Sequence, residues 1–570
     1  MANMYSHENM YPELHKKRPW IRHYDHLVPP EINFPQWPVY ELLFNTANNH
    51  PDKIAMWFYE TETTYWDLAM QVIRFANALV GIGVKKGDRV GVLLPNSPQF
   101  NLAFWGTLTA GAIVVNMNPM YPVDELEFMA KITELETLIT YEECVPKIKE
   151  LTKRVKIPNV IVTKLSDFIK NSGVSTPESL GLEPGWYHFS QLLDSCGKTS
   201  KPRTGVTKND PAVIQFTGGT TGTPKGATLS HANLVAGIYE CAIYGNNITA
   251  TIPVERLKAF CVLPYYHIYG EVCQMGWCIY SAATQIILPR FEINEVLDTL
   301  EKFDDITYFG AVPTMLTAIF NHPRAEKMHL GKKFTFVGCG GGPCPVELIN
   351  KLLDLNVYYS EGWGMSETAS VGMSNPDFGL KKPLSVGVPV PNMDIRIVDP
   401  ETGEDVPQGT PGELLVKGPY VMMGYWNNPE ETAKQLTEDG WLHTGDVVYQ
   451  DEDGYIFIVD RTKDMIIAGG FNIYMQEVDR VIMGHPKVAD VICCGVPDEY
   501  RGETLKAFIQ LKPGVTATEE EIIAFCREKM AAYKVPKMVE FRSELPRSAV
   551  GKALRRILRD EEIAKRQQNK

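Results

Sequence analysis

A short apolar run at residues 212–214 leads directly into a loop of glycines and threonines, and this junction constrains the fold more than any other segment. Residues 215–226 read QFTGGTTGTPKG. Glycines let backbone N–H groups turn around an anion, threonine hydroxyls donate hydrogen bonds, and Lys225 adds a mobile positive charge. The segment therefore predicts a strand followed by a loop that holds a polyphosphate. Because Lys225 precedes a glycine, the loop does not have the spacing of the common P-loop.

Six further motifs follow this loop in order along the chain. They read LPYYHIYG at 263–270, GGGP at 340–343, GWGMSET at 362–368, WLHTGD at 441–446, DRTKD at 460–464, and LPRS with GK within 545–552. Together with residues 215–226 they resemble the signatures of the acyl-adenylate-forming superfamily, which contains acyl- and aryl-CoA synthetases, luciferases and the adenylation domains of peptide synthetases. The resemblance covers about residues 35 to 560, nearly the whole chain.

The composition is that of a folded protein with more than one domain. A chain of 570 residues is longer than a single core usually accommodates. Its hydrophobic content of 44% and charged content of 22% are ordinary for a globular protein. The net charge of −13 argues against nucleic acid as a partner.

No secretory signal peptide and no run of about 18 apolar residues is evident, so we expect a cytoplasmic protein without a transmembrane segment. Peripheral contact with a membrane stays compatible with the sequence. The 11 cysteines show no metal-binding spacing and predict reduced thiols.

Helix-like and strand-like patterns alternate from residue 65 onwards, which predicts an α/β fold with parallel sheets. Helical spacing covers 68–79 and 102–112, and strand-like runs occupy 89–94, 113–115 and 160–162. After Gly387 short β-like runs between glycines and prolines predict a β-rich subdomain at about 387–460. Strand-like runs at 491–496 and 507–511 and a helical pattern at 519–530 predict a small α+β unit at the C-terminus.

We therefore expect three parts: an N-terminal arm at 1–35, an AMP-binding adenylation domain at 36–462 and a C-terminal lid at 463–570. The arm is expected to extend over the body rather than to join the core. The resemblance implies that the lid is mobile and rotates about a hinge at Lys463 between two half-reactions.

The resemblance implies that a carboxylate attacks the α-phosphorus of ATP, giving acyl-AMP and pyrophosphate, and that a thiol, normally that of coenzyme A, then displaces AMP. The carboxylate is already an anion at neutral pH, so positioning and cations carry the catalysis rather than a general base. The resemblance makes Lys552 the expected main catalytic cation and gives Thr217, Lys225 and His267 as further catalytic residues. Glu367 is the expected ligand of Mg²⁺, which prefers carboxylate and phosphate oxygens.

The resemblance assigns nucleotide binding to residues of these motifs: Thr217, Gly218, Gly219, Thr220, Thr221, Gly222, Thr223, Lys225, Gly340, Gly341, Gly342, Glu361, Gly362, Trp363, Gly364, Ser366, Asp446, Arg461, Lys463 and Lys552. Trp363 stands where the family usually has tyrosine and is expected to stack on adenine. Asp446 is expected to accept both ribose hydroxyls. For coenzyme A the resemblance implies Arg290, Gly469 and Gly470, although plant aryl-CoA ligases carry lysines where this chain has Ile467 and Gly469.

The acid is expected to be apolar, a medium- or long-chain fatty acid or an alicyclic or aromatic acid, because no basic residue marks a site for a second carboxylate. The expected pocket residues are His267, Tyr269, Gln274, Trp277, Tyr308, Gly310, Ala311 and Val312. Small residues at Gly310 and Ala311 leave room for a bulky or long tail.

Three alternatives stay open at this point. The acyl group could pass to a carrier-protein thiol, acyl-AMP could react with O₂ as in luciferases, or the chain could be a non-catalytic AMP sensor. A sensor would be expected to lose Lys225, Glu367 or Lys552, and all three are present. The sequence leaves the oligomeric state open between monomer and homodimer, and the reaction can in principle run in reverse.

Overall fold

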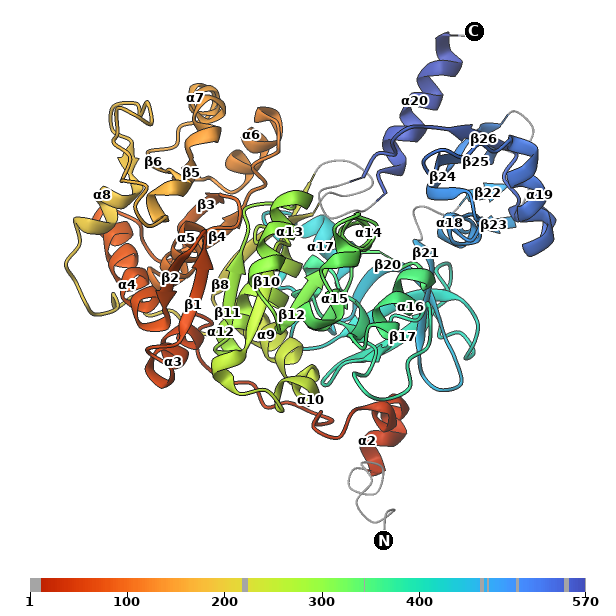
Figure 1. Cartoon of the computed structure of the whole chain (residues 1–570), viewed down its shortest axis with the longest axis horizontal. Helices are drawn as coiled ribbons and strands as arrows, with labels where there is room; N and C mark the ends of the chain where they lie inside the picture. The colour runs from red at the N-terminus through yellow and green to blue at the C-terminus, as the bar shows by residue number, and fades with distance from the viewer. Residues whose placement is uncertain are drawn as a thin grey trace.

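The computed structural model describes residues 12–217, 224–342, 344–461, 466–468, 471–498, 502–547 and 553–568. A large domain contains three sheets, and a smaller C-terminal unit stands at one side of it, blue in Figure 1. The predicted α/β class is confirmed. Two of the sheets have parallel strands at their centres and together position the candidate site.

The first large sheet carries the glycine- and threonine-rich junction. It has eight strands in the order β19-β9-β8-β4-β3-β5-β6-β7. Strands β8, β4, β3, β5, β6 and β7 are parallel, whereas β9 and β19 pair antiparallel at one edge. The strands are β3 (Arg89–Leu93), β4 (Ile113–Asn116), β5 (Thr137–Tyr141), β6 (Asn159–Thr163), β7 (Tyr187–His188), β8 (Pro211–Thr217), β9 (Lys225–Ser230) and β19 (Gly424–Tyr425).

The second large sheet has nine strands in the order β16-β15-β14-β13-β12-β10-β11-β1-β2. Its central strands are parallel, and the segments at their carboxyl ends carry three of the six further motifs, those at 263–270, 340–343 and 362–368. The strands are β1 (Ile54–Phe58), β2 (Thr61–Thr64), β10 (Lys258–Cys261), β11 (Thr284–Ile287), β12 (Ile306–Ala311), β13 (Phe334–Cys339), β14 (Tyr358–Trp363), β15 (Met373–Ser374) and β16 (Val388–Pro389).

Helices cover both large sheets, as α/β architecture requires. They include α3 (Glu41–Asn49), α4 (Tyr65–Gly81), α5 (Pro98–Thr109), α6 (Val123–Ile132), α7 (Val145–Arg154), α8 (Phe189–Asp194), α9 (His231–Tyr244), α12 (Trp277–Ser281), α13 (Ile293–Lys302), α14 (Pro313–Phe320) and α16 (Val346–Asp354). Helix α9 begins where the Ser230 hydroxyl accepts a hydrogen bond from the Asn233 N–H, 3.1 Å away.

An antiparallel sheet of four strands occupies part of the segment predicted to be β-rich, with β17 (Asp394–Val398), β18 (Gly412–Lys417), β20 (Leu442–Gln450) and β21 (Ile456–Arg461). The C-terminal unit has a five-stranded sheet dominated by the long antiparallel pair β24 and β25. Its elements are β22 (Ile466–Ala468), β23 (Phe471–Ile473), β24 (Val488–Asp498), β25 (Gly502–Leu511), β26 (Met538–Phe541), α18 (Met475–Met483), α19 (Glu519–Lys529) and α20 (Arg555–Gln568).

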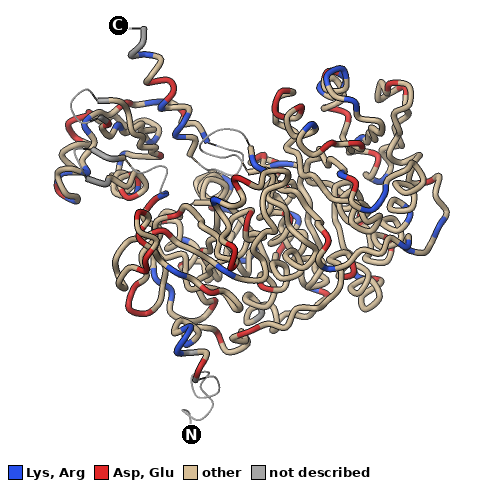
Figure 2. The backbone as a smooth tube through the Cα atoms, turned by 180° about the vertical axis from the view of Figure 1, so that it is seen from behind, with Lys and Arg blue, Asp and Glu red and all other residues tan. Residues whose placement is uncertain are grey.

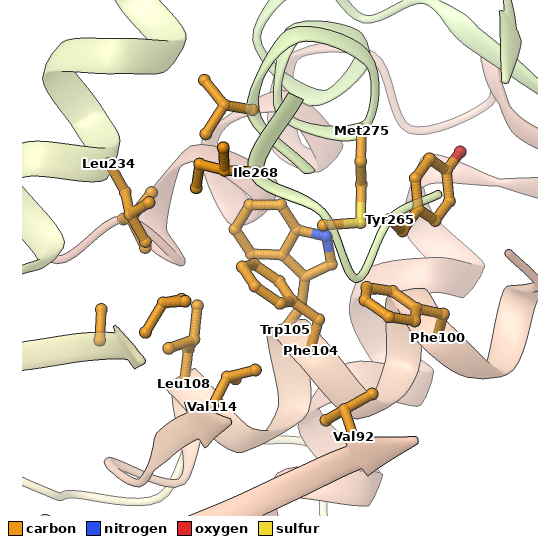
Figure 3. Close-up of a cluster of buried hydrophobic side chains, with 14 of the residues drawn as sticks. Val92, Phe100, Phe104, Trp105, Leu108, Val114, Leu234, Tyr265, Ile268 and Met275 are labelled. Atoms are coloured by element: carbon orange, nitrogen blue, oxygen red, sulfur yellow. The ribbon is translucent and has the colours of Figure 1, made fainter. Parts of the chain in front are cut away.

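The core of the large domain holds the predicted site segment in place. Figure 3 shows Trp105 and Phe104 of α5 packed beside Tyr265 and Ile268. Tyr265 is fully buried, and its hydroxyl lies 2.8 Å from the Gln285 side-chain oxygen. Since Tyr265 and Ile268 flank His267 in the sequence, this packing fixes where His267 can lie.

The N-terminal arm was expected to lie outside the core, and this expectation is wrong for its second half. Trp20, Ile21 and Tyr24 are buried in the main hydrophobic core. They follow a short helix, α2 (Pro12–Lys17), and lie in or beside a 3₁₀ turn at Pro19–His23. The aromatic content of the arm is explained by this packing, because large apolar side chains are stabilised by burial.

Charged residues are interspersed along the chain, as Figure 2 shows, with Lys and Arg next to Asp and Glu in both the large domain and the C-terminal unit. All 11 cysteines are unpaired. None of the described helices combines the length and the apolar character needed to cross a membrane.

Replacing Trp105 by alanine is expected to destabilise the large domain by about 3–5 kcal/mol, because a fully buried indole leaves a cavity. The check is the thermal unfolding midpoint. The matched control is Trp66→Ala, since Trp66 is 50% exposed and its loss leaves no cavity. Equal shifts for the two variants would contradict the placement of Trp105 in the core.

Candidate functional site

Lys225 begins β9 directly opposite Thr217, the last residue of β8. Its ammonium group forms an ion pair with Glu431 and lies 5.3 Å from the ring centre of Tyr425. Hydrogen bonds from Lys225 and Lys434 lower the pKa of Glu431 to about 2. The predicted phosphate-side lysine is therefore held by an acidic partner, which a polyanion can replace.

Glu367 lies in a 3₁₀ turn, Ser366–Thr368, and is almost fully buried. The Tyr425 hydroxyl donates a hydrogen bond of 2.9 Å to its carboxylate. Because the Tyr425 ring also contacts Lys225, one tyrosine joins the predicted Mg²⁺ ligand to the predicted phosphate lysine. Tyr425 lies on the two-residue edge strand β19, which pairs with β9.

Trp363 and Arg461 meet on the carboxylate of Asp446. The Trp363 indole N–H donates to one oxygen at 2.8 Å, and the Arg461 Nε atom lies 3.0 Å from the other. Asp446 and Arg461 are direct partners on the antiparallel strands β20 and β21. Three residues expected to bind the nucleotide thus come together. Trp363 fixes Asp446 through its indole N–H, and its ring stays the one expected to stack on adenine.

A single cavity runs along the nine-stranded sheet between its face and α9. At the carboxyl ends of the strands it is lined by Gly340, Gly341, Gly362, Trp363, Gly364 and Ser366. Gly341 has a φ of +79°, which favours glycine. Ligands of α/β proteins bind at this edge of a sheet, where loops follow the parallel strands.

Further inside, the cavity walls are aromatic and apolar. His267, Tyr269, Trp277, Tyr308 and Val312, all predicted for the acid pocket, line it. The Tyr269 hydroxyl donates to the Gly338 carbonyl at 3.2 Å, and the Tyr308 and Trp277 rings lie 5.2 Å apart. The His267 Nδ1 atom accepts from the Tyr269 N–H at 3.3 Å.

Several predicted residues do not line this cavity. Gln274 is buried and donates to the backbone carbonyls of Phe260 and Gly310, so it braces the wall. Gly310 is covered by the Tyr308 hydroxyl and Gln274, which a Cβ atom there would approach to 3.0 and 3.1 Å. Ala311 packs into the hydrophobic cluster that also contains Phe309.

Glu361 also does not line the cavity, although its neighbours Ser360 and Gly362 do. Successive side chains of a strand point to opposite faces, so Glu361 faces away. Its carboxylate accepts a hydrogen bond of 3.0 Å from the Cys344 N–H, and burial raises its pKa to about 7. The side chain supports the glycine turn rather than the cavity wall.

Arg290 is exposed, beyond the end of β11, and is not among the residues that line the cavity. Gly342 is exposed at the turn after β13. The remaining predicted residues lie outside the described residues: Gly218, Gly219, Thr220, Thr221, Gly222, Thr223, Lys463, Gly469, Gly470 and Lys552.

Sequence reasoning missed Tyr425 and Glu431, which have no motif around them. It also missed two buried acids on the cavity wall, Glu240 and Asp377. Glu240 offered a signal, because it is the lone carboxylate in the apolar stretch HANLVAGIYECAIY of α9.

A polar network behind His267 was missed as well. Asn116 donates to the carboxylate of Glu271, which begins the π-helix at Glu271–Gly276. Gln215 on β8 bridges to the Tyr266 carbonyl at 3.0 Å and so ties the glycine-rich junction to the His267 segment. Burial raises the pKa of Glu271 to about 8.

No three His, Cys, Asp or Glu side chains in the described part of the chain gather in a way that would hold a metal ion alone. Glu367 does fit a Mg²⁺ site completed by phosphate oxygens and water, because Mg²⁺ often takes only one or two protein carboxylates. Its fixed carboxylate, oriented by Tyr425, is the donor that such a site needs.

Comparisons with known proteins agree with this geometry. Residues 43–426 match the AMP-binding enzyme family, and residues 477–552 match the AMP-binding enzyme C-terminal domain. A long-chain-fatty-acid–CoA ligase of Bacillus subtilis (strain 168) is 38% identical over 560 residues, covering 96% of this chain and 99% of that protein. One from Escherichia coli O6:H1 is 34% identical over 561 residues, with coverages of 96% and 98%.

Among solved structures, the anthranilate CoA ligase AuaEII in complex with anthranoyl-AMP matches with a TM-score of 0.83 and 26% identity. The match covers 93% of this chain and 98% of that one. A fatty acyl CoA synthetase of Mycobacterium tuberculosis matches with a TM-score of 0.68 and 27% identity, covering 93% and 99%.

Replacing Glu271 by glutamine is expected to flatten the pH dependence of stability. Unfolded glutamate loses its proton near its ordinary pKa of 4.5, whereas folded Glu271 keeps it to about 8. Between these values the folded state binds more protons, so the wild-type free energy of unfolding falls as pH rises, by up to about 1.4 kcal/mol per pH unit. Glutamine has no such titration.

The measurement is the melting temperature from pH 5 to pH 8 for both proteins. The control is Glu326→Gln at an exposed position. If Glu271→Gln keeps the full wild-type slope, Glu271 is not the protonated buried acid inferred here.

Proposed function

This chain belongs to the AMP-binding enzyme family, and we propose that it joins an apolar, long-chain carboxylic acid to coenzyme A through an acyl-AMP intermediate. A carboxylate oxygen attacks the α-phosphorus of ATP and pyrophosphate leaves. The sulfur of coenzyme A then attacks the acyl carbon and AMP leaves.

One observation carries this proposal: a single cavity contains both kinds of wall that the reaction needs. Its outer part is lined by the glycine turns and Trp363, and its inner part by Tyr269, Trp277 and Tyr308. An acid whose tail lies among these aromatic side chains presents its carboxylate beside His267, next to the nucleotide side. Binding that brings two anions together in this way supplies much of the catalysis.

The residues of the outer part have distinct proposed roles. Asp446, fixed by Trp363 and Arg461, is proposed to accept the ribose hydroxyls. Lys225 is proposed to leave Glu431 and pair with phosphate oxygens. Glu367 would hold Mg²⁺, which would neutralise phosphate charge there.

The roles of Lys552, Lys463, Gly469 and Gly470 stay predictions because these residues lie outside the described residues, and the role of Arg290 stays a prediction because Arg290 does not line the cavity. Lys552 is proposed to bridge the carboxylate and the α-phosphate, and Lys463 to be the hinge of the C-terminal lid. Gly469 and Gly470 are proposed to line the path of the pantetheine arm. Arg290, which is exposed, is proposed to meet the phosphates of coenzyme A only when that substrate is bound.

AMP release by the purified protein with ATP, Mg²⁺ and a panel of carboxylic acids tests the function directly. We expect AMP formation that requires both an apolar acid and coenzyme A. Acid-dependent exchange of pyrophosphate without turnover of coenzyme A would instead favour transfer to a carrier-protein thiol. Absence of any acid-dependent reaction would refute the proposal.

Replacing Tyr425 by phenylalanine is expected to raise the Mg²⁺ concentration for half-maximal rate roughly tenfold, because the carboxylate of Glu367 loses the donor that orients it. The ring beneath Lys225 is kept. The matched control is Tyr420→Phe, whose hydroxyl donates to the Pro391 carbonyl instead. An unchanged Mg²⁺ requirement for Tyr425→Phe would remove the proposed metal site from Glu367.

A further inference from the structure

The inner end of the cavity is polar, although its walls are apolar. It is lined by Glu240 and Tyr244 on α9, by Ser374 at the end of β15 and by Asp377 three residues further along the chain. Asp377 precedes Phe378, whose ring lies 5.3 Å from that of Tyr358 at the amino end of β14. The opposite end of β14 carries Trp363, so Asp377 lies away from the nucleotide side, whereas Ser374 pairs with Gly362 nearer to that side.

Glu240 is 1% exposed, and neither of its carboxyl oxygens has a hydrogen-bond partner within the described part of the chain. Burial raises its pKa well above the ordinary value for a glutamate. The nearby positive charge of Arg18 is engaged elsewhere, because its Nε atom lies 2.9 Å from Asp394. Buried polar groups are rarely left without a partner.

The hydroxyl groups around Glu240 are also engaged elsewhere. Tyr24 donates to the Pro389 carbonyl at 2.6 Å, and Tyr420 donates to the Pro391 carbonyl at 3.0 Å. Tyr244, one helical turn after Glu240, donates to the Ser374 carbonyl at 3.0 Å. The hydrogen bonds of the Glu240 carboxyl can therefore be completed by a ligand in the cavity.

Asp377 presents a second carboxyl group to the same cavity. It is 3% exposed, and its Oδ2 atom has no hydrogen-bond partner among the described residues. Its backbone N–H donates to Asp25 at 2.6 Å, which fixes the loop. Burial raises the pKa of Asp377 to about 7, and the negative charge of Asp25 adds to this effect.

We propose that the carboxyl group of Glu240, with Asp377 as a second carboxyl group on the wall of the same cavity, provides a subsite for a hydroxyl group near the far end of the acyl chain, so that the enzyme prefers hydroxylated long-chain acids to plain ones. The proposal rests on the proposed ligase function and specifies its substrate. A carboxyl group both donates and accepts hydrogen bonds, as a hydroxyl does. An alkyl chain leaves the Glu240 carboxyl unsatisfied, and an unsatisfied buried group disfavours binding.

The test compares kcat/KM for two series of acids with the wild-type enzyme. Each terminally hydroxylated acid is paired with the plain acid one carbon longer, in which a methyl group replaces the hydroxyl. A purely apolar cavity prefers the plain acid at every length, because burying an unpaired hydroxyl is unfavourable. We expect the hydroxylated acid to be preferred about tenfold at one chain length, where the hydroxyl reaches the subsite.

Variants separate the subsite from general packing. Glu240→Leu is expected to reverse the preference at that length and to raise kcat/KM for the plain acid. Asp377→Asn, which keeps hydrogen-bonding groups, is expected to retain most of the preference. The matched control is Tyr239→Phe, because Tyr239 neighbours Glu240 on α9 but packs against Tyr280 instead of lining the cavity.

The outcomes distinguish the two proposals. Turnover of plain acids with no preferred hydroxylated length overturns the subsite and leaves the ligase function standing. A stronger preference for acids that carry a terminal amino group than for acids that carry a terminal hydroxyl overturns the assignment of the subsite to a hydroxyl group. Failure of both series to release AMP removes the ligase function, and the subsite with it. If Glu240→Leu does not fold, the wild-type comparison alone decides.

Discussion

The alternation of side chains along β12, β13 and β14 determines what this protein can bind. Tyr308, Gly338 and Gly362 stand on the cavity face, whereas Phe309 and Glu361 do not line the cavity; Trp363, at the last position of β14, reaches the cavity where the strand ends. The glycines create the space: a Cβ atom at Gly338 would lie 3.2 Å from the Tyr308 ring, and one at Gly362 would lie 2.9 Å from the Met373 carbonyl. A shift of one residue along any of these strands would move its large side chains to the cavity face and fill the cavity.

A short edge strand connects the parts of the site that bear charge. Tyr425 lies on β19, about 200 residues beyond Lys225 in the sequence, yet β19 pairs with β9 and places the tyrosine between Lys225 and Glu367. The contact couples the segment expected to hold phosphate with the segment expected to hold Mg²⁺. A phosphate bound at Lys225 or a Mg²⁺ ion bound at Glu367 would therefore change the electrostatic surroundings of the other group through Tyr425.

The sequence predicted the elements and motifs well because their signals are local. Apolar spacing gave the helix at 68–79, which lies within α4, and the strand at 89–94, of which all but the last residue forms β3. Pairing between distant segments has no local signal, so Tyr425 and Glu431 were missed. Ala311 and Glu361 were wrongly assigned to the site because they lie next to site residues in the sequence. Neighbouring residues of a strand face opposite sides of the sheet, so closeness to a motif does not show which side a residue faces. Gln274 is polar in an apolar wall because it satisfies two backbone carbonyls.

The two buried acids at the inner end change how the cavity can discriminate. Apolar walls distinguish acids by only about 1–3 kcal/mol per methylene, so chain length alone gives weak selection. A buried group adds a second basis for discrimination, because a ligand either satisfies it or leaves it unpaired at a cost of about 1–3 kcal/mol. Glu240 is the only carboxylate of α9, at a buried position where a leucine would pack without that cost. A ligand that completes the hydrogen bonds of the Glu240 carboxyl would remove that cost.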